Sequence, residues 1–229
     1  MRPVPIAVTA ALAFGAVLAA SAPPAATPAP PPVQRARAAA SPSLAAEVMP
    51  VPAEALGATY RAGCPVGPEQ LRLIRMNHWG FDGQVHRGAL VVHKDAVGPL
   101  LGAFGKVFAA RFPIRRMQPA SAYGGDDGRS MADDNTSAFN CRPVTGDPSR
   151  RSQHAYGDAV DINPVENPYV DRSGTVHPAA GRANLRRDRP VPGMIRPGDA
   201  VSRAFGEIGW AWGGRWPHPD YQHFSATGG

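Results

Sequence analysis

The residues best suited to chemistry lie in two short segments of the second half of the sequence. His154 and Asp161 stand seven residues apart with Gly157 between them, and Asp220 precedes His223 by three residues. Two imidazoles and one carboxylate can supply the three protein ligands of a catalytic zinc, which keeps a fourth position for water. A second carboxylate beside that position can take a proton from the water. We therefore expect His154, Asp161 and His223 to bind zinc and Asp220 to act as a general base.

A short strand and a tight turn would bring the first two ligands together. Residues 159–162 alternate in character, which predicts a strand with Asp161 facing a cleft and the branched apolar side chains facing the core. Gly157 permits a turn that returns His154 to the side of Asp161. His223 lies among apolar neighbours on a predicted final strand, from which it can supply the third ligand.

Simpler explanations exist for these residues, because a histidine near an aspartate is most often a hydrogen-bonded or surface pair. Asp158 is a rival for Asp161, although the alternation turns it to the opposite face. His218 is a rival ligand, although the prolines on both sides of it favour exposure. The remaining histidines and a tryptophan cluster have no ligand-like context, and we interpret them as structural, surface or core residues: His78, His86, His93, His177, Trp210, Trp212 and Trp216.

Periodicity predicts a mixture of helices and strands around these segments. Apolar residues spaced three and four apart predict helices over 97–112 and 199–208, which end before Pro113 and at Gly209. No regular β-α-β alternation is present, so the elements favour an α+β domain. The other expected elements are strands at 85–93, 114–117, 159–162, 210–212 and 222–225, a helix or strand over 68–76, a loop over 121–134, and an irregular excursion over 163–197 that walls a cleft.

The first 48 residues differ in composition from the rest. Arg2, an apolar run over 6–20 and small residues up to Ala22 predict a secretory signal peptide over 1–22. A short membrane anchor is the alternative, but the run is shorter than the roughly 18–20 residues that span a bilayer. Residues 23–48 are rich in proline and alanine, which predicts a linker or stalk. The remaining residues, 49–229, are enough for one domain.

Charge and cysteine content indicate the surroundings. The formal net charge is +6, which fits either attraction to anionic wall polymers or an ordinary solvated surface. Basic residues are not interleaved with aromatic ones, so the sequence does not indicate a nucleic-acid partner. We also expect the protein to be a monomer. Cys64 and Cys141 in an exported domain predict a disulfide that would stabilise the fold by about 4 kcal/mol, with a two-cysteine zinc site as the alternative.

The two chemical segments match a family pattern when they are taken together. The first reads His154-x-x-Gly157-x-Ala159-x-Asp161, and the second reads Asp220-x-x-His223-Phe224. This pattern resembles the D-alanyl-D-alanine carboxypeptidase family of zinc peptidases, which includes VanY-type carboxypeptidases and L-alanyl-D-glutamate endopeptidases. The resemblance covers roughly residues 65–226 and takes in these further segments: Phe112-Pro113-Ile114, residues 135–142 and Trp212-Gly213-Gly214.

The resemblance implies a role for each matching residue. The zinc ligands and the general base would be the four residues already named. Arg142 would orient the substrate and steady the developing oxyanion, since a guanidinium offers a planar fork to carboxylate or carbonyl oxygens. A structural ion pair with the Asp126–Asp127 loop is the simpler explanation of Arg142. Ser152 would contact the substrate through its hydroxyl group.

The resemblance also implies a fold and an activity. The fold would be a small α+β domain with a central antiparallel sheet, flanking helices and an open zinc cleft. The protein would be a secreted, cell-wall-associated zinc metallopeptidase that hydrolyses D-amino-acid peptide bonds of peptidoglycan stem peptides, in first place a D-alanyl-D-alanine carboxypeptidase. The alternatives are an L-alanyl-D-glutamate endopeptidase, a non-catalytic wall-binding module on the same fold, and a domain whose zinc is purely structural.

Overall fold

The computed structural model describes residues 42–228. The predicted signal peptide over 1–22 and most of the predicted linker over 23–48 lie outside these residues. The first strand begins at Glu47, inside the range expected to be linker. Between residues 42 and 228, no helix has both the length and the apolar character needed to cross a membrane.

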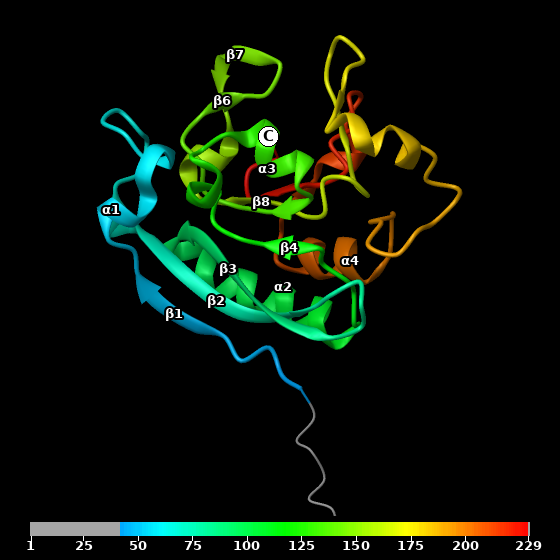
Figure 1. The fold of residues 1–229 in the computed structure, drawn as a ribbon, viewed down its shortest axis with the longest axis horizontal. Helices are drawn as coiled ribbons and strands as arrows, with labels where there is room; N and C mark the ends of the chain where they lie inside the picture. Colours follow the sequence, from blue (N-terminus) through cyan, green and yellow to red (C-terminus); the bar gives the residue numbers. More distant parts are fainter. Residues whose placement is uncertain (1–41, 229) are drawn as a thin grey trace, which may run out of the picture. The chain divides into compact units, whose positions relative to one another are not determined.

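Helices and strands are mixed along the described part of the chain, as expected for an α+β domain (Figure 1). The helices are α1 (Ala53–Leu56), α2 (Val97–Ala109), α3 (Asp127–Ala132) and α4 (Ala200–Glu207). The strands are β1 (Glu47–Pro50), β2 (Leu71–Trp79), β3 (Val85–His93), β4 (Arg116–Met117), β5 (Asn135–Thr136), β6 (Pro143–Val144), β7 (Asp147–Arg151), β8 (Ala159–Asp161), β9 (Tyr169–Val170), β10 (Val176–His177), β11 (Ala211–Trp212) and β12 (His223–Ser225).

The longest strands form an antiparallel sheet in the order β1-β2-β3. The strand predicted over 85–93 is confirmed as β3, and it pairs along its whole length with β2. The ambiguous stretch over 68–76 divides into a 3-10 turn at Pro68–Gln70 and the start of β2. Helix α2 packs on β2, and α4 packs on α2 (Figure 1).

The main core joins this sheet to a second one. The second sheet has the order β11-β12-β8 and is antiparallel. Its inward side chains Val160 and Phe224 are fully buried with Phe104 of α2 and Phe205 of α4. Phe205 stacks on Phe224 with ring centroids 4.3 Å apart. The apolar side chains of both helices and both sheets therefore fix where β8 and β12 lie.

A smaller core cluster lies near the disulfide. The bond joins Cys64 to Cys141, as the sequence predicted. Cys141 is buried with Phe139, Leu71 and Val91, so the bond ties the segment before β2 to the chain that enters the site.

Two regions differ from the sequence-based expectations. The strands are distributed over several small sheets, so a single central sheet is not confirmed. The prediction of a loop over 121–134 is wrong, because this stretch contains α3. The first turn of α3 is capped by Asp126, whose side chain accepts a hydrogen bond from the Arg129 amide. The excursion over 163–197 is not fully irregular, since it holds the β9–β10 hairpin and a 3-10 segment, Ala179–Asn184.

Candidate active site

Pairing of the second sheet sets the floor of the site. In the antiparallel register of β8 and β12, Asp161 lies directly opposite His223. Their neighbours Val160 and Phe224 also lie opposite one another and enter the core. Since successive side chains of a strand point to opposite faces, burial of this apolar pair turns Asp161 and His223 to the other face.

A 3-10 turn at Gln153–Tyr156 carries the third side chain. Its first amide groups are capped by Ser152, whose hydroxyl oxygen accepts from the His154 amide at 3.3 Å. Gly157 ends the turn in the left-handed region, with φ of 75°. A Cβ atom there would lie 2.7 Å from the His93 amide nitrogen, so the close approach to β3 requires glycine. The predicted turn is thereby confirmed, and it returns His154 to β8.

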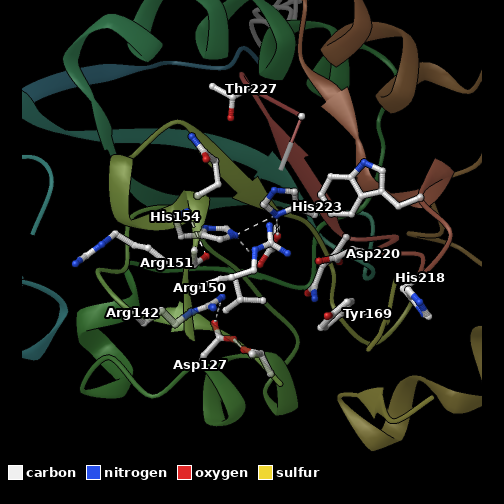
Figure 2. A pocket seen from close by; sticks show the side chains of 18 of the residues that line it. Asp127, Arg142, Arg150, Arg151, His154, Tyr169, His218, Asp220, His223 and Thr227 are labelled. Carbon is white, nitrogen blue, oxygen red and sulfur yellow. Dashed lines mark hydrogen bonds and ion pairs between the residues drawn. The ribbon is translucent and has the colours of Figure 1, made fainter. Parts of the chain in front are cut away.

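The atoms of the three side chains that could bind a metal converge, as Figure 2 shows for the two histidines. His154 Nε2 lies 3.0 Å from one oxygen of Asp161 and 3.2 Å from Nδ1 of His223. His223 Nδ1 lies 2.9 Å from the other oxygen of Asp161. All three side chains are buried. Around a tetrahedral zinc with bonds of about 2.0–2.1 Å, ligand atoms would stand about 3.3 Å apart, so the spacing of this group fits the ion.

Hydrogen bonding also fits a cation at this place. His154 Nδ1 lies 2.6 Å from the Ala138 carbonyl oxygen and donates to it, which fixes the ring with Nε2 toward the carboxylate of Asp161. Burial alone would raise the pKa of Asp161, but the two imidazoles outweigh it and hold this pKa well below its usual range. A cation among these groups would be bound by the ionised carboxylate and by the two ring nitrogens that face it.

Asp220 lies beside His223 and lines the same cavity (Figure 2). Its backbone is held by Gly213, whose carbonyl oxygen accepts from the Asp220 amide at 3.0 Å, and by a bridge to Tyr169. Its Oδ1 atom is buried and has no hydrogen-bond partner among the described residues. Burial first, and then the negative charge of Asp161, raise the pKa of Asp220 to about 7. The side chain is therefore placed to exchange a proton with a molecule in the cavity.

Arg142 lines the same cavity and is also ion-paired. Its guanidinium lies 2.8 Å from Asp127 on α3, and the other Asp127 oxygen accepts from Thr145 at 2.7 Å. The two sequence interpretations of Arg142 are thus compatible, because the pair fixes a side chain that still borders the cavity. Its buried Nε atom has no partner among residues 42–228.

The remaining sequence candidates fall around this centre. Ser152 is buried and borders the cavity, and its hydroxyl oxygen caps the turn that carries His154. Asp158 is held by the side chain of Gln153 at 2.8 Å and lies outside the converging group. His218 is exposed at the cavity edge and also lies outside that group.

The cavity has a volume of about 680 Å³ and includes residues that the sequence did not indicate. Trp216, interpreted as core, instead borders the cavity, with its ring 5.4 Å from that of His223. Tyr169 and Arg172 reach it from the excursion, and Arg150 reaches it from β7. No local pattern marks these residues, since their position depends on how the two hairpins fold back over the floor.

Comparison with known proteins agrees with this geometry. Residues 145–226 match a family model described as D-alanyl-D-alanine carboxypeptidase. No curated protein and no solved structure matches the chain. The matched segment contains all three converging side chains and Asp220, whereas Arg142 lies just before it. The resemblance read from the sequence is thereby confirmed over residues 145–226.

Proposed function

We propose that the protein is an exported zinc peptidase that hydrolyses D-amino-acid peptide bonds in peptidoglycan stem peptides, and that it acts as a D-alanyl-D-alanine carboxypeptidase. The observation that carries the proposal is the convergence of His154, Asp161 and His223 beside Asp220 in one cavity. The family match over 145–226 supports both the reaction class and the substrate class.

The side chains divide the work of hydrolysis. Zinc held by the three ligands would polarise the scissile carbonyl and bring the pKa of its water to about 7. Asp220 accepts a proton from the attacking water at its unpartnered Oδ1 atom and passes it to the leaving amine. Arg142, fixed by Asp127, orients the substrate and offsets negative charge on the scissile oxygen, a contribution of about 3 kcal/mol to the barrier.

An endopeptidase is the second candidate, and one observation favours it. A further hollow of about 470 Å³ shares Tyr156 and Asp158 with the main cavity. A substrate that continues on both sides of the cleaved bond needs such an extended surface, whereas removal of a terminal residue does not. The L-alanyl-D-glutamate endopeptidase reaction therefore uses more of the hollowed surface.

Metal analysis beside a digest of defined muropeptides tests the proposal. We expect about one zinc per chain, release of D-alanine as the sole small product, and loss of release when a chelator removes the metal. Products cut inside the stem would replace the carboxypeptidase by the endopeptidase. Stoichiometric zinc with binding but no new amine would identify a wall-binding module. Turnover that is unaffected by complete removal of the metal would overturn the zinc mechanism.

A further inference from the structure

Two short hairpins meet at the mouth of the cavity. Strands β6 and β7 form one hairpin, which carries Arg150, and β9 and β10 form the other, which carries Arg172 in its turn. The hairpins touch, because a Cβ atom on Gly146 would lie 3.0 Å from a carboxylate oxygen of Asp171. Arg150 and Arg172 are both exposed and both border the cavity, and Figure 2 shows Arg150 among the side chains that line it.

Neither arginine has a direct carboxylate partner within residues 42–228. Asp171 precedes Arg172, but its oxygens are taken up by its own hairpin: one accepts from Ser173 and Thr175, and the other lies 2.8 Å from His177. Arg142 differs, because Asp127 already pairs with it. The mouth of the cavity therefore presents two guanidinium groups that can take an anion.

The phenol of Tyr169 lines the same cavity as these two cations and the candidate base. Tyr169 is half-buried, and its ring stacks on His177 with centroids 5.7 Å apart. Burial raises the pKa of Tyr169, as do the charges of Asp220 and Asp171, whereas Arg172 and Arg150 lower it. The phenol is thus within electrostatic reach of both guanidinium groups, and it stays protonated as a hydrogen-bond donor at neutral pH.

We propose that Arg150, Arg172 and Tyr169 form a carboxylate-binding subsite at the cavity mouth, which holds an acidic peptide substrate. The proposal rests on the proposed function for the identity of the substrate as a peptide. Guanidinium groups bind carboxylates through paired, charge-assisted hydrogen bonds, and the phenol adds a third donor. Two sources of the anion share this chemistry, the C-terminal carboxylate of the peptide and a carboxylate on one of its side chains.

Binding of matched peptides to the zinc-loaded protein tests the subsite. The probe is a short D-alanine-ended peptide with one acidic side chain, made non-hydrolysable by replacing the scissile amide with a methyleneamine. Its C-terminal amide and its side-chain amide are made separately, and dissociation constants are measured by calorimetry. We expect the wild-type protein to bind one of the two amides about 10-fold more weakly than the acid, which identifies the carboxylate that is read.

Variants connect that preference to the named residues. Arg150→Ala and Arg172→Ala should each weaken binding of the acid about 5-fold to 10-fold and leave binding of the discriminating amide nearly unchanged. Tyr169→Phe should have a smaller effect of about 3-fold. Arg75→Ala is the matched control, since Arg75 is exposed on β2 and does not border the cavity.

The two proposals fail in different ways. Equal losses for the acid and both amides in the arginine variants, or an unchanged preference for the acid, would overturn the subsite whatever the turnover. Release of D-alanine from the hydrolysable peptide by the wild-type protein tests the function separately. Carboxylate-selective binding without any release would keep the subsite and overturn the peptidase.

Discussion

The floor and the wall of the cavity are held by different forces. The floor is built from β8, β12 and the turn at Gln153–Tyr156, and fully buried apolar side chains lie directly beneath it. The wall is the excursion over 163–197, in which hydrogen bonds from buried polar side chains add to the packing of a few buried apolar ones. The candidate ligands and base lie on or beside the floor, and the proposed substrate contacts Tyr169 and Arg172 lie on the wall.

Asn167 shows how the wall is held. Its amide group donates to the carbonyl oxygens of Ile162 and Gly193, and its own oxygen accepts from the Ile195 amide. Arg187 donates to that same oxygen. Its guanidinium carbon also lies 4.5 Å from the ring centroid of Tyr221, the residue that follows the candidate base Asp220 in the sequence. A buried polar network of this kind has directional contacts, so loss of one member leaves several partners unsatisfied.

We therefore expect that mutations can separate the chemical step from substrate binding. Changes in the floor should remove metal or turnover without unfolding the chain, because its frame rests on the apolar core. Changes in the wall should act on stability and substrate binding first, because hydrogen bonds of buried polar side chains such as Asn167 hold it in place.

The largest expected effect is the loss of metal from the floor. His154→Ala removes one of three ligands, so zinc should fall to well below one equivalent and turnover should fall by about 1000-fold or more. Zinc is measured by atomic absorption and turnover by release of D-alanine. His86→Ala is the control, because His86 lies on β3 in an exposed pair with Asp82. Full zinc occupancy in His154→Ala would remove this residue from the ligand set.

The next effect separates the base from the metal. Asp220→Ala should keep about one zinc per chain and lower turnover by about 100-fold to 10,000-fold, since proton transfer at that position is lost. Asp188→Ala makes the same change in an exposed ion pair outside the cavity and should leave turnover unchanged. Normal turnover in Asp220→Ala would show that another group moves the proton.

The floor could be predicted from the sequence because its signals are local. The glycine turn, the alternation around Asp161 and the apolar spacing of α2 and α4 each lie within a short stretch. The wall could not, because Asn167 and Arg187 find their partners far along the chain and leave no periodic pattern. Helix α3 was missed because its six residues are too short for periodicity, and only the Asp126 cap marks its start.

A mutation in the wall tests its dependence on polar contacts. Asn167→Ala leaves buried carbonyl and amide groups unsatisfied, which should lower the free energy of unfolding by about 3 kcal/mol. For a domain of this size that is a fall in Tm of about 6–12 °C, measured by calorimetry. Asn184→Ala is the matched control, since the Asn184 amide makes one hydrogen bond, to the Val165 carbonyl, and should cost about 1 kcal/mol. Equal losses in the two variants would contradict the role given to Asn167.

The smallest expected effect is a pH dependence that belongs to the wall. Burial, and then the neighbouring carboxylate of Asp134, raise the pKa of Glu166 to about 8. The folded chain therefore keeps a proton on Glu166 that the unfolded chain releases near its ordinary pKa of 4.5, so this group weakens the fold as the pH rises from about 4.5 to about 8. Glu166→Gln is uncharged throughout, and its Tm should fall a few degrees less than that of the wild-type protein between pH 5 and pH 8. The loss is limited because Arg115 lies 3.9 Å from Glu166 and partly offsets the charge. Glu54→Gln, at an exposed position on α1, serves as the control. If the Tm of Glu166→Gln changes with pH as much as that of Glu54→Gln and of the wild-type protein, Glu166 is excluded as the source of the pH dependence.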